Sequence, residues 1–99
     1  MADKIKLDYR LADEMSKAFH KAHEQLEQTM QEMRGVADTV EGGALLGRGG
    51  DAFKDSIRGK LCTSIDKLAR KMLELEVDVT KAKHAMQQAD TESQQQFGN

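Results

Sequence analysis

The 99-residue sequence contains no proline, no tryptophan, a single cysteine and few aromatic residues. Because proline is absent, the strongest helix breaker is missing, and the abundant Glu, Gln, Lys, Met, Leu and Ala favour helix. The lone cysteine, Cys62, excludes an internal disulfide. The formal net charge of −2 gives no excess of basic residues for binding nucleic acid. The composition therefore predicts one all-α domain over residues 1–99, without a nucleic-acid partner.

Long apolar runs are also missing. No stretch approaches the roughly 20 apolar residues that a membrane-spanning helix needs. The chain starts with MADKIKLDYR, which is charged and lacks the apolar segment of a signal peptide. We therefore expect a protein that is made in the cytoplasm without a signal peptide and that does not insert into a membrane.

Five of the eight glycines fall in the stretch EGGALLGRGGDAF, residues 41–53, between two long helix-like segments. The predicted segments are a first helix over about 7–40, a turn over 41–50, a second helix over about 51–90 and a flexible tail over 91–99. Asp8 is the predicted N-cap of the first helix, and Asp51 should either cap the second helix or interact favourably with its positive N-terminal end. Because the linker is short, the helices should pack as an antiparallel hairpin. The two leucines of the turn should fold inward over Phe53.

Apolar residues recur at steps of three and four along both segments, as on one face of a helix. In the second segment the pattern is typical of a coiled-coil seam. The residues predicted to pack within the hairpin or between two hairpins are Phe19, Leu26, Met30, Met33, Leu61, Ile65, Leu68, Met72, Leu75 and Val79. Further apolar residues flank these stripes, among them Leu11, Val36 and Val77, and a lone hairpin would expose them. We therefore expect two hairpins, identical or similar, to pair into a four-helix bundle.

His20 and His23 lie three residues apart, a spacing that suits metal ligands on one helix face. In a hairpin that turns near residue 46, however, His20 would face basic residues near position 70. A solvated surface is therefore the preferred interpretation. Cys62 has no catalytic partners around it and is interpreted as a packed small residue. The sequence predicts no metal, no cofactor and no enzyme activity.

Leu45-Leu46-Gly47, followed by RGGDAF, resembles the turn of the WXG family of small ESAT-like helical hairpins. That family places Trp-any-Gly in the turn and an aromatic residue soon after it. Here Leu45 stands at the Trp position, Gly47 at the Gly position, and Phe53 is the later aromatic residue. Family members often end the second helix with a Tyr-any-any-any-Asp/Glu export signal, and Met86 and Asp90 stand at its two positions here.

This resemblance implies a non-enzymatic interaction protein that is secreted through a type VII system as a folded dimer. Its partners would be a second copy or a similar hairpin, and the export ATPase of the system. The resemblance leaves open an alternative, a cytoplasmic adaptor for a larger type VII secreted toxin. A plain structural coiled-coil dimer without a link to secretion is a second alternative.

Overall fold

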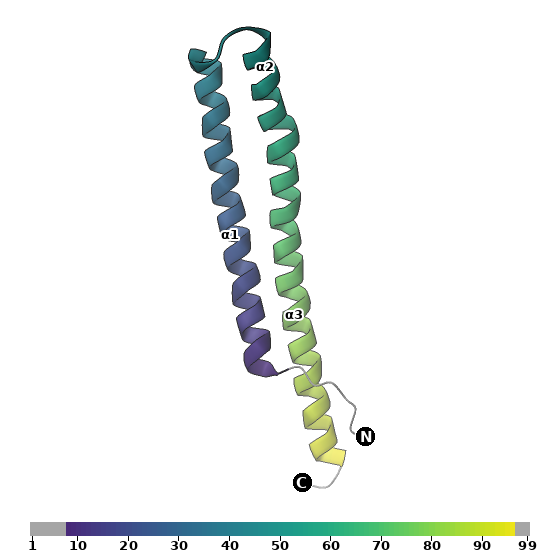
Figure 1. The fold of residues 1–99 in the computed structure, drawn as a ribbon. Coiled ribbons are helices and arrows are strands. Elements are labelled where there is room, and N and C mark those ends of the chain that lie inside the picture. Colours follow the sequence, from purple (N-terminus) through teal and green to yellow (C-terminus); the bar gives the residue numbers. More distant parts are fainter. Residues whose placement is uncertain (1–7, 97–99) are drawn as a thin grey trace.

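A computed structural model describes residues 8–96, and over this range the protein is an antiparallel helical hairpin without strands (Figure 1). The first arm consists of α1 (Tyr9–Thr39) and the wider helical segment η1 (Val40–Ala44). The second arm consists of α2 (Gly47–Asp55), the wider segment η2 (Ser56–Leu61) and α3 (Cys62–Gln96). The hairpin measures 76 × 18 × 16 Å. The predicted all-α hairpin is confirmed.

The start of α1 agrees with the sequence-based prediction, whereas α3 ends later than predicted. Asp8 caps α1 as predicted, because its side chain accepts a hydrogen bond of 2.9 Å from the backbone N–H of Arg10. Residue 7, where the helix was expected to begin, lies outside the described residues. The second helix was expected to end near residue 90, but α3 continues to Gln96. Residues 60–96 contain neither proline nor glycine that would end it, and 97–99 are not described.

The turn is shorter than the predicted 41–50. Within η1, Gly43 has a φ of 110°, a left-handed conformation that glycine adopts without strain, and the first arm ends one residue later, at Ala44. Leu45 and Leu46 then cross between the arms in extended conformation, and α2 begins at Gly47. Asp51 consequently lies inside α2 and does not cap it. Leu46 holds the N-cap position and makes no side-chain capping bond.

Gly50 lets the crossing segment lie directly on α2. A Cβ atom at this position would be 2.1 Å from the carbonyl oxygen of Leu45, far inside van der Waals contact. Gly50 is itself buried, although its neighbours in the turn are exposed. The glycine is therefore a steric requirement for the close approach of the backbone, in addition to any flexibility it gives.

The core between the arms is thin. The buried apolar residues of the described chain are Ala12, Met30, Ala37, Val40, Ile57, Cys62 and Ala69, and three of these are alanine. No large side chain in the described range is less than 2% exposed. Met33 and Ile65 pack against the buried cluster from its sides. One seam between two helices is thus all that the hairpin buries by itself.

The wide segment η2 sets which face of α3 meets α1. The backbone N–H of Cys62 donates to the carbonyl of Ile57, five residues back. In a regular α-helix, residues five apart diverge by about 140° around the axis. The wide turn narrows this divergence, so that Ile57 and Cys62 are both buried, at 5% and 4% exposure. The seam of α3 continues from Cys62 and not from Leu61.

The predicted interface residues do not all pack within the hairpin. Leu61 and Leu68 are 42% and 48% exposed, and their neighbours Cys62 and Ala69 are buried instead, so Leu61 and Leu68 stay predicted contacts to a second hairpin. The predicted residues Ile65, Met72, Leu75 and Val79 are partly buried. The hairpin itself buries the more polar side of the stripe of α3 and leaves the more apolar side uncovered.

Candidate interaction surfaces of the hairpin

One long edge of the hairpin is closed by polar contacts between the arms, and we call it the polar edge. Its cross-arm pairs are Arg58–Asp38, Arg58–Glu41, His23–Ala69, His20–Glu76, Lys83–Asp13 and Tyr9–Asp90. Next to the turn, the Arg58 guanidinium lies 2.6 Å from Asp38 and also contacts Glu41. The hydrogen bonds that the guanidinium donates to these two carboxylates raise the pKa of Arg58. The polar edge is thus held at its upper end by a branched ion pair.

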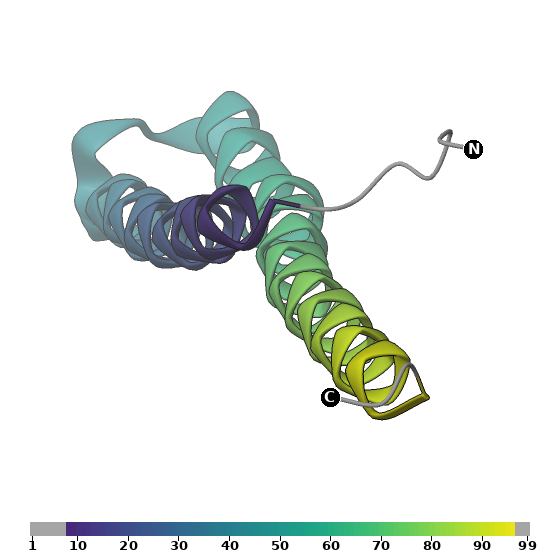
Figure 2. The same cartoon turned by 90° about the horizontal axis from the view of Figure 1, so that it is seen from below.

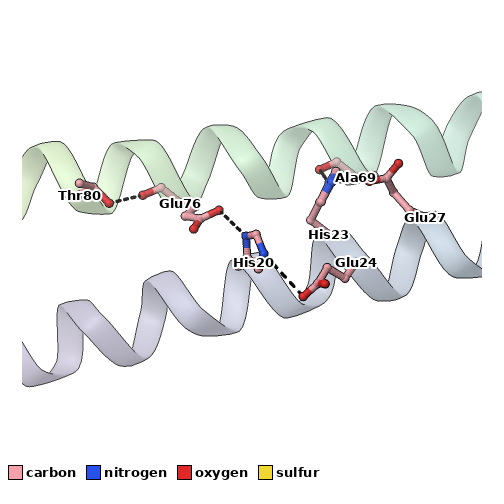
Figure 3. A network of polar contacts seen from close by, with 7 residues as sticks. All are labelled: His20, His23, Glu24, Glu27, Ala69, Glu76 and Thr80. Atoms are coloured by element: carbon pink, nitrogen blue, oxygen red, sulfur yellow. Dashed lines mark hydrogen bonds and ion pairs between the residues drawn. The ribbon is translucent and has the colours of Figure 1, made fainter.

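His20 occupies the middle of the polar edge (Figure 3). Its Nδ1 lies 3.2 Å from Oε1 of Glu76 on α3, and its Nε2 lies 3.6 Å from Glu24 one turn along α1. The expectation that His20 would face basic residues near position 70 is wrong. The wide segment η2 contributes to this difference. One helical turn of η2 contains an extra residue, so the residues that follow it in the second arm lie closer to the hairpin turn.

His23 lies one helical turn from His20 on α1 and also contacts the second arm. Its Nδ1 is 3.0 Å from the backbone carbonyl of Ala69, and its Nε2 contacts Glu27 on its own helix. Figure 3 shows both histidines directed from α1 toward α3. Within residues 8–96 no three His, Cys, Asp or Glu residues are arranged to hold a metal ion. Both histidines are therefore explained by cross-arm polar contacts.

The lower end of the polar edge is closed by two pairs. Lys83 Nζ lies 2.7 Å from Asp13 Oδ1. About one helical turn further along α1, away from the Leu45–Leu46 crossing, the phenol of Tyr9 donates a hydrogen bond to Oδ2 of Asp90. This bond, with the partial burial and the negative charge of Asp90, raises the pKa of Tyr9. Beyond Asp90, α3 projects past the start of α1 (Figures 1 and 2).

The opposite edge is apolar and open, and we call it the apolar edge. It consists of Met15 and Phe19 on α1 with Leu61, Leu68, Leu75, Val79 and Ala82 on the second arm. Its lower half is a groove of about 270 Å³ lined by Met15, Phe19, Leu75, Asp78, Val79 and Ala82. Toward the turn, the seven-residue spacing places Leu68 and Leu61 on the same face as Leu75. Four of the predicted interface residues therefore lie along this edge on the second arm, namely Leu61, Leu68, Leu75 and Val79.

The turn residues Leu45, Gly47 and Phe53 do not fill the space between the arms. Leu45 and Phe53 are about half exposed, at 49% and 48%, and Leu46 is 79% exposed. The expectation that the leucines fold inward is therefore wrong. Buried Val40 and Ile57 close this end of the seam instead. Leu45 contacts α2 through its backbone, because its carbonyl group lies directly against Gly50.

Met86 and Asp90 lie where α3 passes the start of α1. Both are partly buried, and of the two only Asp90 has a described hydrogen bond to α1, the one from Tyr9. Sequence reasoning missed Tyr9, Gly50 and Ala69. The roles of all three depend on contacts across the fold, since the periodicity of α3 fits Leu68 as well as Ala69.

Within residues 8–96 no helix has both the length and the apolar character needed to cross a membrane. Searches of curated proteins and of solved structures gave no match. One family model does match, that of proteins of about 100 residues with a WXG motif, and it covers residues 4–91. The match includes both arms, the turn at Leu45–Gly47, Met86 and Asp90. The chain therefore belongs to the WXG100 family of small helical hairpins associated with type VII secretion.

Proposed function

We propose that this protein is a non-enzymatic type VII secretion substrate that leaves the cell as a folded dimer. In this dimer the apolar edge packs against a second hairpin, and the two hairpins form a four-helix bundle. The observation that carries the proposal is the open apolar edge on a hairpin of this family, with Leu61 and Leu68 more than 40% exposed. Contiguous apolar strips on soluble proteins are typical of protein–protein interfaces.

The thin core supports the dimer. A chain of this length that buries a single seam of small residues leaves much of its apolar surface in water. Four-helix bundles solve this problem because each helix then packs against two neighbours. The polar edge already carries cross-arm ion pairs and hydrogen bonds. The second hairpin should therefore approach from the apolar edge.

We assign the proposed export signal to Met86 and Asp90, the two positions that correspond to the family signal. Asp90 is only partly buried and lies where α3 begins to project past α1. We expect Asp90→Ala to remove the protein from the culture supernatant while the cellular protein stays dimeric. Immunoblots of supernatant and cell fractions measure export, and light scattering measures the oligomeric state. Unchanged export of the variant would refute the signal assignment.

A cytoplasmic adaptor for a larger secreted toxin is the second candidate. Leu45 and Met86 favour it, because they replace the two aromatic residues of the family motifs, and an adaptor can depend on the signal of its client. A pull-down of the full chain from the producing cell, with mass spectrometry of the bound proteins, separates the two candidates. A small hairpin, or a second copy, together with an export ATPase supports the secreted dimer. A large multidomain chain supports the adaptor.

A further inference from the structure

We propose that Tyr9 supplies, from helix α1, the tyrosine that position 86 lacks, so that Tyr9 and Asp90 form one composite recognition site. This inference rests on the proposed export function of Asp90. Tyr9 and Asp90 are 81 residues apart in the sequence, yet the phenol donates a hydrogen bond to the carboxylate. The hydroxyl and the acid are therefore side by side at the open end of the hairpin.

The position of Tyr9 is set by its surroundings. Asp8 caps the first turn of α1, which fixes Tyr9 as the first residue of the helix. The pair Lys83–Asp13 lies one turn closer to the hairpin turn and holds the two helices in register. Tyr9 lies about one helical turn outward from Asp13, and Asp90 lies about two turns outward from Lys83, so the phenol reaches outward along α3 to the acid. The phenol is thus presented beside the segment that corresponds to the family signal.

The chemistry of position 86 explains why a second residue is needed. In a Tyr-any-any-any-Asp signal the two side chains are neighbours on one face of a helix, about 5–6 Å apart. Met86 gives an apolar side chain but its thioether cannot donate a hydrogen bond. Tyr9 restores a ring and a hydroxyl next to the acid, from the opposite helix. A tyrosine hydroxyl is protonated at neutral pH, because its ordinary pKa is about 10, and the bond to Asp90 raises the pKa of Tyr9 further. The hydroxyl is therefore a donor to the carboxylate.

The site is accessible to a partner. Tyr9 and Asp90 are both partly exposed, and α3 continues beyond them to Gln96 past the start of α1. The complementary surface would combine an apolar cleft for the phenol ring with an arginine or lysine for the carboxylate. The site differs from a signal carried by one helix in a testable way. It exists only when the hairpin is folded, so recognition would report that the two arms are correctly paired.

The test is export of Tyr9→Phe, which removes one hydroxyl and keeps the ring. We expect its fraction in the culture supernatant to fall at least about tenfold, as for the loss of a hydrogen bond to a charged group. Lys83→Met is the matched control, because it breaks the neighbouring cross-arm pair without touching Tyr9 or Asp90. Thermal unfolding followed by circular dichroism verifies that both variants are folded. The double variant Tyr9→Phe/Met86→Tyr returns a tyrosine to α3 and should recover export.

Each result is decisive. Loss of export in Tyr9→Phe and recovery in the double variant support the composite site. Normal export of Tyr9→Phe, while Asp90→Ala is not exported, overturns the composite site and leaves the proposed function intact. Failure of Met86→Tyr to restore export, or an equal loss in Lys83→Met, also overturns it, because Tyr9 would then only fasten the helix ends. Normal export of Asp90→Ala overturns the proposed signal and this inference together.

Discussion

At the scale of single residues, the glycines of the turn have different roles: Gly43 and Gly47 have positive φ, whereas Gly50 allows a close backbone contact. Nothing lies within 4 Å of a Cβ built at Gly42 or Gly49, whereas a Cβ at Gly50 collides with the Leu45 carbonyl group. The glycine-rich stretch marked the turn, but composition could not rank its glycines. Their roles depend on where the crossing segment lies relative to α2. The cap at Asp8 could be predicted because it depends only on the two residues that follow it.

We expect Gly50→Ala to lower the free energy of unfolding by about 1–3 kcal/mol, the usual cost of overpacking a tight contact. Gly49→Ala is the matched control. It meets open space at a helical position, so the greater helix propensity of alanine should leave stability unchanged or raise it by up to about 1 kcal/mol. Urea unfolding followed by circular dichroism measures both. Equal stability of the two variants would contradict the steric role of Gly50.

At the scale of elements, η2 decides which side of α3 faces α1. The positions 61, 68 and 75 and the positions 62, 69 and 76 complete the same pattern of three- and four-residue steps around Ile65 and Met72. Sequence reasoning chose the first set because it contains leucines. The apolar residues indicate which side of α3 is covered in the complete assembly. They do not tell whether α1 of the same hairpin or a second hairpin covers that side. The hydrogen bond from the N–H of Cys62 to the carbonyl of Ile57 turns the second set toward α1. This bond cannot be predicted from the spacing of the apolar residues.

The wide turn makes a prediction about deletions. Removing Gly59 would place Ile57 and Cys62 four residues apart, the spacing at which a regular α-helix keeps both on one face. We therefore expect the Gly59 deletion to preserve the hairpin, with a change in stability within about 1 kcal/mol.

A deletion in regular helix provides the contrast. Removing Ser64 rotates the rest of α3 by about 100° relative to α1 and should separate the cross-arm pairs below it. Thermal unfolding of both deletions measures the difference. If the two were equally destabilised, η2 would not be the element that sets the register.

At the scale of the whole molecule, the two edges of the hairpin have different tasks. The polar edge contains the described ion pairs between the arms and the hydrogen bond from Tyr9 to Asp90, whereas the apolar edge carries exposed leucines and a groove. The division follows from the rotation of α3, which turns Glu76 and Lys83 toward α1 and Leu68 away from it. The sequence predicted that apolar surface would be left over, but not on which edge.

We expect Leu68→Glu to dissociate the proposed dimer, because a carboxylate would be buried at the apolar edge without a partner. Val77→Glu is the control, since Val77 is similarly exposed, at 50% against 48%, but lies among the charged residues Lys71, Glu74, Asp78 and Lys81 and not in the groove. Light scattering should find a monomer for the first variant and a dimer for the second. A dimer in both would place the interface elsewhere.

The length of the hairpin affects how such experiments are read. A compact chain of about 100 residues has a radius of gyration near 13 Å, whereas this hairpin has one of 22.0 Å. A globular protein would need roughly 400 residues to reach that value. In size-exclusion chromatography a single hairpin of 11.0 kDa will therefore leave the column well ahead of globular standards of its own mass. A monomer calibrated against such standards would be taken for an oligomer, so only a method that measures mass independently of shape can count the chains.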